Sequence, residues 1–255
     1  MEPGIYYTKF NGILLGGIMS KLVIISTLGA SLLTNYALHL KKNPREFLEY
    51  IDSISTSEFE SMKRDIIAYL RSLGDSFPRS SAELSSIVDI LKDYNLSKYS
   101  EIELMFSVSD TKQGRLVIDV LKDFIEDNMA KSYGKIINVY RDIIEGLNYV
   151  DIEHATRGLP TLAARVAIWI RNHLFAGNDV IINVTGGFKA ESIYVAFIGI
   201  IAGVPTYYMH EKFRKCILLP PFPSELFALS DKMKEAIFHY IKSFYDRFMA
   251  QYSKS

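Results

Sequence analysis

A continuous apolar run that stops at two glycines constrains this chain more than any other feature. Residues 179–185 read DVIINVT, and an unbroken β-branched run is typical of a strand buried on both faces of a parallel sheet. Gly186 and Gly187 follow, and they let the backbone turn tightly. Residues 188–202 are then almost wholly apolar and predict a helix that is central in the fold. A buried strand, a tight turn and an apolar helix in succession indicate an α/β protein.

The same succession recurs along the chain. Residues 21–27 (KLVIIST) form a second β-branched run, and residues 32–40 after it are expected to be helical. Further strands are predicted at residues 101–109, 135–140, 206–209 and 215–219, and further helices at residues 110–128 and 159–175. Alternation of this kind implies right-handed crossovers and a Rossmann-like, mostly parallel sheet with helices on both faces.

The chain is long enough for one such domain with an attached helical piece. Residues 20–223 are expected to form the Rossmann-like domain, with a helical insert at about residues 41–98. Residues 1–19 are expected to be an N-terminal extension, because they precede the first strand.

Helix starts are marked within the insert. Ser57 with Glu60, and Ser80 with Glu83, have the spacing of capping boxes and predict two of these starts. Residues 224–255 carry apolar side chains at helical spacing and predict an amphipathic C-terminal helix. That helix either packs on its own domain or provides a contact for a second copy or another partner.

Composition excludes several classes of function. Lysine plus arginine equals aspartate plus glutamate, at 29 each, so no general basic field is available to hold a long nucleic acid. One cysteine and five scattered histidines predict neither a disulfide framework nor a metal site. The apolar stretches at residues 12–33 and 193–204 are interrupted or short, so we expect no membrane span and a cytoplasmic protein.

The turn after residues 179–185 has the chemistry of an anion site. Backbone N–H groups are unpaired at a helix start, and the helix dipole favours negative charge there. Thr185 offers a hydroxyl, and Lys189 adds a full positive charge in the first turn of the helix. The alternative is a glycine turn that only packs the helix on the strand, with Lys189 solvated.

A second turn of the same kind follows the first strand. Residues 26–31 read STLGAS, so that Thr27, Gly29 and Ser31 bring hydroxyls and a flexible backbone to another helix start. Ser31 taken alone could serve only as a helix N-cap. Neither turn matches the phosphate loop of nucleotide hydrolases or the glycine fingerprint of dinucleotide enzymes. Because ligands of parallel sheets bind beyond the carboxyl ends of the strands, we expect both turns to face one site.

A third group of polar residues follows the predicted strand at residues 101–109. Asp110 and Thr111 belong to the same edge of the sheet and are candidates to line the pocket. Their side chains are equally suited to capping the helix that comes next.

Three motifs in this order resemble the CARF domains of CRISPR-associated proteins. They are ISTLGASLLTN at residues 25–35, SDTKQG at residues 109–114 and NVTGGFKAE at residues 183–191. The resemblance spans roughly residues 20–220. It implies a Rossmann-like fold, a homodimer, and binding of cyclic oligoadenylates across the two-fold axis.

The resemblance also implies an activity. No Arg-x-x-x-x-His motif of an attached ribonuclease occurs in the chain, so it is similar to the stand-alone ring nucleases. Those enzymes cleave cyclic tetra-adenylate to linear di-adenylate with a 2′,3′-cyclic phosphate, without metal or cofactor, and so switch off antiviral signalling. The matching catalytic residues here are Ser31 and Lys189. The ligand-binding residues would be Thr27, Gly29, Asp110, Thr111, Thr185, Gly186, Gly187 and Phe188.

Two alternatives stay open at this point. The first is a non-catalytic CARF sensor that regulates a partner, and the second is an ordinary nucleotide-sugar or dinucleotide enzyme on a Rossmann sheet. Both four- and six-membered rings would use the same phosphate turns, so the sequence does not fix the size of the ligand.

Overall fold

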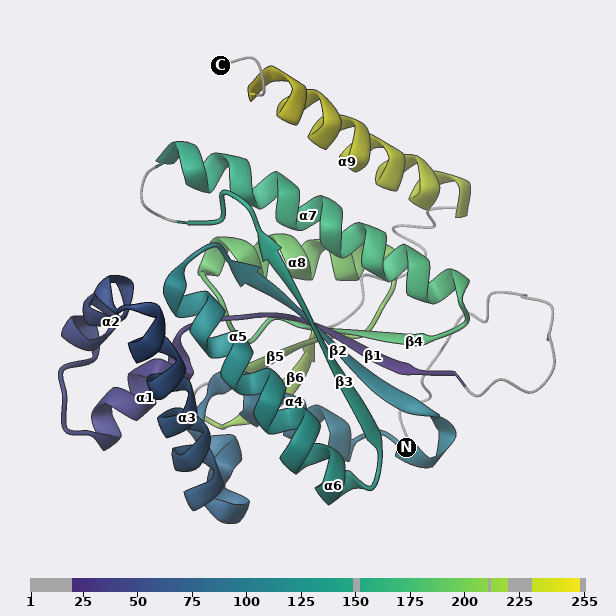
Figure 1. Cartoon of the computed structure of the whole chain (residues 1–255). Coiled ribbons are helices and arrows are strands. Elements are labelled where there is room, and N and C mark those ends of the chain that lie inside the picture. The colour runs from purple at the N-terminus through teal and green to yellow at the C-terminus, as the bar shows by residue number, and fades with distance from the viewer. Residues whose placement is uncertain (1–19, 149–151, 211, 220–230, 253–255) are drawn as a thin grey trace.

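A six-stranded sheet forms the centre of the protein (Figure 1). The computed structural model describes residues 20–148, 152–210, 212–219 and 231–252. The predicted N-terminal extension therefore lies outside the described residues. The strands are β1 (Leu22–Thr27), β2 (Glu101–Ser109), β3 (Ile136–Ile144), β4 (Asp179–Asn183), β5 (Thr206–His210) and β6 (Lys215–Leu219).

The strand order is that of a Rossmann-like fold. Strands run β3-β2-β1-β4-β5-β6 across the sheet, parallel from β3 to β5, and β6 is antiparallel to β5. The predicted mostly parallel sheet is confirmed. β1 and β4 lie at the centre, where the order of the strands reverses, and this is the point at which open α/β sheets bind ligands.

Helices cover both faces of the sheet (Figure 1). In chain order they are α1 (Ser31–His39), α2 (Pro44–Ser53), α3 (Thr56–Ser72), the 3₁₀ helix η1 (Gly74–Ser80), α4 (Ala82–Lys92), the 3₁₀ helix η2 (Leu96–Lys98), α5 (Lys112–Phe124), the π-helical turn η3 (Ile125–Met129), α6 (Ala130–Tyr133), α7 (Ile152–Phe175), α8 (Lys189–Ala202) and α9 (Asp231–Tyr252).

Alternate residues of the strands enter two separate cores. In β1, Leu22 and Ile24 point to the larger core, beneath α1 to α5, while Val23 and Ile25 point to the core beneath α7 and α8. All four side chains are fully buried. Burial on both faces is why the strands read as unbroken apolar runs in the sequence.

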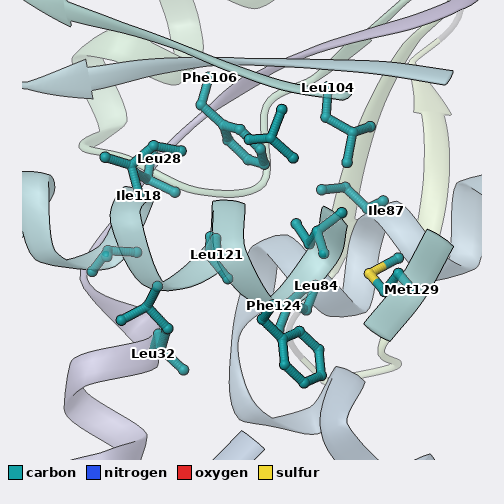
Figure 2. Close-up of a cluster of buried hydrophobic side chains, with 14 of the residues drawn as sticks. Leu28, Leu32, Leu84, Ile87, Leu104, Phe106, Ile118, Leu121, Phe124 and Met129 are labelled. Carbon is teal, nitrogen blue, oxygen red and sulfur yellow. The ribbon is translucent and has the colours of Figure 1, made fainter. Parts of the chain in front are cut away.

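The larger core is where the helical insert joins the domain. Figure 2 shows Leu104 and Phe106 of β2 facing Leu84 and Ile87 of α4 and Leu121 of α5. The helix α4 therefore packs on the sheet itself. Its position brings its first turn close to the start of α1.

Both predicted capping boxes are wrong by one or two residues. The box at the start of α3 joins Ser55 with Glu58, because the serine pattern there occurs in two registers. At α4 the N-cap is Ser81, which accepts a hydrogen bond from the Leu84 N–H. The preceding 3₁₀ helix continues to Ser80, which displaces the start of α4 by one residue and frees the Glu83 side chain for another use.

The prediction that α8 is a central helix is also wrong. One side of α8 packs on the sheet through Val195 and Ile198. On its other side Ile193 is 67% exposed and Phe197 is 58% exposed. The apolar sequence of α8 thus reflects one buried face and one exposed apolar face.

The C-terminal helix α9 lies along α7 (Figure 1). Phe238 packs against the second core, and Glu235 forms an ion pair with Arg171 of α7 at 3.5 Å. This is the first of the two expected arrangements, packing on the chain's own domain. Within the described part of the chain, no helix is both long and apolar enough to span a membrane.

Candidate functional site

The two glycine turns lie side by side at the carboxyl edge of the sheet. β1 and β4 are neighbouring parallel strands with Ser26 level with Asn183, so their turns leave the sheet together. The Thr27 hydroxyl of the first turn donates a hydrogen bond to the Gly186 carbonyl of the second. A side chain at Gly29 would bring its Cβ to 2.8 Å from the backbone nitrogen of Gly187. The predicted convergence of the turns is therefore present, and glycine permits their close approach.

Ser31 in the first turn is held by a neighbouring helix. Its hydroxyl donates a hydrogen bond to Oε2 of Glu83 at 2.8 Å and accepts one from the Ala82 N–H at 2.9 Å. The N-cap of α1 is Ala30, without a side-chain cap. Ser31 is therefore not a simple N-cap, and its contacts lead to the first turn of α4.

Glu83 is the residue that the sequence analysis missed. Its side chain is fully buried between the two turns, and its Oε1 accepts a hydrogen bond from the Gly29 N–H at 2.8 Å. A Cβ at Gly186 would overlap this carboxylate oxygen, so the second turn is shaped around it as well. Burial raises the pKa of Glu83, while hydrogen bonds from its own backbone N–H, from Gly29 and from Ser31 act in the opposite direction.

A second polar contact connects α4 with the turns. Asn183, at the end of β4, donates hydrogen bonds to Ser26 at 3.1 Å and to Ser86 at 2.8 Å. Ser86 is three residues after Glu83 and therefore on the same face of α4. All of these polar side chains are buried, so α4 braces both strand ends from one side of the sheet.

The second turn is closed mainly by its own residues. The Thr185 hydroxyl donates to the Asn183 side chain at 2.7 Å and accepts from the Met209 N–H at 3.1 Å. The Phe188 N–H donates to the carboxylate of Glu191, in the first turn of α8, at 3.2 Å. The expectation that the N–H groups at both helix starts are unpaired is thus wrong for Gly29 and Phe188, because carboxylates of the protein already accept from them.

Lys189 and Phe188 point to solvent at the start of α8. Both residues are exposed, Phe188 to 54%. Lys189 forms no ion pair with any residue in the described part of the chain. Its charge is therefore available to a ligand, and it stands on the same helical stripe as the exposed Ile193 and Phe197.

Asp110 and Thr111 have local partners. Thr111 is the N-cap of α5 and accepts a hydrogen bond from the Gly114 N–H at 3.0 Å. Asp110 forms an ion pair with Arg115 at 2.7 Å. The capping alternative is confirmed for Thr111. Ser107 is the β2 residue level with Thr27, and β2 continues for two more residues, so the chain leaves the sheet later at Asp110 and Thr111 than at the turn after β1.

The described residues around the site offer hydrogen bonds and the charge of Lys189. In the part of the chain that the structure describes, no three His, Cys, Asp or Glu side chains form a group able to hold a metal ion. The arrangement can bind a small anionic ligand through Lys189 and the backbone of the turns.

Residues 78–222, more than half of the chain, match the family described as CRISPR-associated protein (Cas_APE2256). The chain belongs to this family of CRISPR-associated proteins. The resemblance to CRISPR-associated proteins is thereby confirmed. The matched residues include Glu83, the second glycine turn and strands β2 to β6, while the first glycine turn precedes them.

Among solved structures, this CRISPR-associated chain is similar to Can2 from Sulfobacillus thermosulfidooxidans, determined in complex with cyclic tetra-adenylate. The identity is 12% and the TM-score is 0.33, over 78% of this chain and 34% of the Can2 chain. The chain thus spans about a third of the length of Can2.

Proposed function

We propose that this CRISPR-associated protein binds cyclic tetra-adenylate at the paired glycine turns and cleaves it to linear di-adenylate that ends in a 2′,3′-cyclic phosphate. The observation that carries the proposal is the contact between the turns after β1 and β4, with Lys189, which has no ion-pair partner among the described residues, beside it. The family match and the three motifs supply the class of ligand. Can2, a protein of similar kind, is known in complex with the same ring.

Phosphate binding would centre on the second turn. Lys189 supplies a full positive charge at the start of α8, where the helix dipole also favours an anion. A lysine in the first turn of a helix opposes that dipole, and a bound phosphate would remove the conflict. The balanced net charge of the chain is no obstacle, because only local charges act at this distance.

Cleavage would use groups already at the site. A ribose 2′-hydroxyl held in line attacks the neighbouring phosphodiester, so that no metal or cofactor is needed. Lys189 stabilises the charge that develops on the phosphorane, and Ser31 positions the ribose. Turnover is expected to be slow, since orientation and electrostatics carry the reaction.

The proposed active form is a homodimer that meets at the exposed apolar face of α8. Ile193, Tyr194 and Phe197 are each 48% to 67% exposed on this face, and Lys189 continues their stripe toward the turn. A two-fold axis along the face would bring two copies of the site together. A ring of four equivalent nucleotides has the matching symmetry, so each copy would receive half of the ligand.

One observation favours the alternative, a sensor that binds the ring without cleaving it. The Ser31 hydroxyl is committed to Glu83, so it is not free to donate a hydrogen bond to a phosphate. In that case the bound ring would act by stabilising the dimer and presenting a surface to a partner.

Incubation with radiolabelled cyclic tetra-adenylate in EDTA distinguishes these functions. Wild type, Lys189→Ala and Lys98→Ala are compared, because Lys98 is an exposed lysine of η2 at the opposite edge of the sheet. The proposal expects di-adenylate from the wild type and Lys98→Ala, and little from Lys189→Ala. Tight binding without product identifies a sensor, and no binding by the wild type rejects both functions.

A further inference from the structure

The Ser31 hydroxyl has only one hydrogen-bonding direction left for a ligand. A hydroxyl has one proton to donate and two lone pairs to accept with. The Ser31 proton is directed to Glu83, and one lone pair receives the Ala82 N–H. Ser31 remains partly exposed, so its second lone pair can meet a ligand. That lone pair accepts and cannot donate.

The carboxylate of Glu83 fixes this direction. Both oxygens of Glu83 accept hydrogen bonds, Oε1 from the Gly29 N–H and Oε2 from Ser31. Full burial keeps water from replacing Ser31 as the partner of Oε2. The hydroxyl is therefore held with its proton toward the protein.

A phosphate oxygen is also an acceptor, so it cannot form a hydrogen bond with this lone pair. It would also stand close to the buried negative charge behind Ser31. A ligand hydroxyl, by contrast, can donate to the Ser31 lone pair. Lys189 and the second turn provide the charge for a phosphate on the other side of the same site.

We propose that Glu83 is a positioning residue that makes Ser31 a hydrogen-bond acceptor toward the ligand, so that the first turn selects a ribose 2′-hydroxyl and leaves the phosphate to the second turn. The inference rests on the proposed function for the identity of the ligand. It assigns to Glu83, whose side chain is fully buried, control over which sugar is accepted.

The same geometry gives a path for the proton if the ring is cleaved. The 2′-oxygen loses its proton to Ser31 Oγ, and Ser31 passes its own proton to Oε2 of Glu83. The bond from the 2′-oxygen to phosphorus forms, the bond from phosphorus to the 5′-oxygen breaks, and the 5′-oxygen takes a proton from water. Glu83 later returns its proton to solvent, so that charge and atoms balance. Burial raises the pKa of Glu83 and makes it a better proton acceptor than a solvated glutamate.

The test compares the binding of two rings to matched variants. Glu83→Gln keeps the shape of the side chain and an acceptor for Gly29, but its NH₂ group would donate to Ser31. Both lone pairs of Ser31 would then be used, and its proton would point to the ligand. Ser31→Ala removes the hydroxyl altogether. Affinities for cyclic tetra-adenylate and for its 2′-fluoro analogue, whose 2′ group cannot donate a hydrogen bond, are measured by calorimetry at neutral pH, with thermal melting as a control for folding.

The wild type is expected to bind the ribose ring about tenfold more tightly than the 2′-fluoro ring, as for one hydrogen bond. The ratio should fall to near one in Glu83→Gln and Ser31→Ala, with no further change in the double variant. If Glu83 only supports the fold, Glu83→Gln will lower the affinity for both rings equally. An unchanged ratio of the two affinities overturns the inference. If Glu83→Gln fails to fold, a preference that persists in Ser31→Ala overturns it in the same way. Binding of neither ring by the wild type rejects the proposed function, and the inference with it.

Discussion

The two glycine turns follow neighbouring strands and look alike in sequence, yet the protein completes them in different ways. The turn after β1 is held by a buried carboxylate from another helix, through the contacts of Glu83 with Gly29 and Ser31. The turn after β4 is closed within its own strand and helix, by Asn183 and Glu191, and leaves Lys189 exposed. One turn thus presents an acceptor backed by negative charge, and the other presents a cation. A local pattern shared by two turns does not determine what each can bind, since side chains far away in the sequence set their polarity.

The largest effect is expected from removing the charge of the second turn. Lys189→Ala should slow ring cleavage roughly 100- to 1,000-fold, as for loss of one group that stabilises a transition state. Single-turnover rates with cyclic tetra-adenylate measure this. A loss of similar size in Lys98→Ala would mean that general charge, and not the second turn, drives the reaction.

The next largest effect is expected on stability, from a side chain added between the two turns. In Gly186→Ala the new Cβ would overlap the Glu83 carboxylate and approach the Thr27 carbonyl to 2.9 Å. Forced separation of two packed segments is expected to lower the free energy of unfolding by about 3 kcal/mol. Urea denaturation measures the change.

Gly134→Ala is the matched control for that substitution. Gly134 has a φ of +57°, and a Cβ there would meet no atom within 4 Å. The substitution is therefore expected to lower the free energy of unfolding by only about 1 kcal/mol, the cost of a left-handed backbone at alanine. Equal losses in the two variants would show that contact between the turns contributes nothing to stability.

The brace from α4 to β4 should have an intermediate effect. Asn183→Ala removes the donor to Ser26 and Ser86 and leaves two buried hydroxyls without that partner. We expect a loss of about 2 kcal/mol in the free energy of unfolding. Thr34→Ala serves as a control, because Thr34 lies in α1 and is only half-buried. Native stability in Asn183→Ala would mean that α4 does not brace the second turn.

The smallest effect concerns the other anchor of α4, and it depends on pH. Burial acts to raise the pKa of Asp89, but hydrogen bonds from the Cys216 N–H and from Lys215 outweigh it and lower the pKa below its ordinary value. Asp89→Asn should therefore cost about 1 kcal/mol at neutral pH.

The sign of the pH dependence follows from the lowered pKa of Asp89. A carboxyl whose pKa is lower in the folded state stabilises the protein above its unfolded pKa of about 4, and the contribution is lost as pH falls through the folded pKa. Melting curves from pH 7 to pH 2 should show wild type and Asp89→Asn converging at the acid end. A constant difference at all pH values would exclude the ionised carboxylate as its cause.

The sequence predicted the central strands β1, β2 and β4 well because burial on both faces leaves a clear apolar pattern. β2 and β6 have the predicted limits, and β1 and β4 differ by one or two residues at an end. β3 continues four residues beyond its predicted end at residue 140. The meeting of the turns was predictable too, since parallel strands of one sheet end at the same edge.

Glu83 could not be recognised from sequence in the same way. Its partners Ser31 and Gly29 are 52 and 54 residues away, and no local pattern encodes such a contact. The nearby serines gave it a plausible role as a capping residue instead. A glutamate at an otherwise apolar and small-residue helix start was the one available signal.

The exposed face of α8 was missed for a different reason. Apolar residues all round a helix are equally consistent with a core helix and with a helix that keeps one face for an interface. Only the packing of α8 against the sheet and α7 shows that Ile193 and Phe197 lie on its exposed face.

The pairing of β1 with β4 also has a consequence for how the protein is made. Their residues are about 157 positions apart, as in the hydrogen bond from Asn183 to Ser26, so the ribosome completes β1 long before β4 exists. Pairings this distant in the sequence form slowly and late in folding. Residues up to 144 contain β1, β2, β3 and most of the larger core, to which Ile181 of β4 and Tyr207 of β5 are added later. The contact between the two glycine turns therefore forms only after β4 has been made, later than the pairing of β1, β2 and β3.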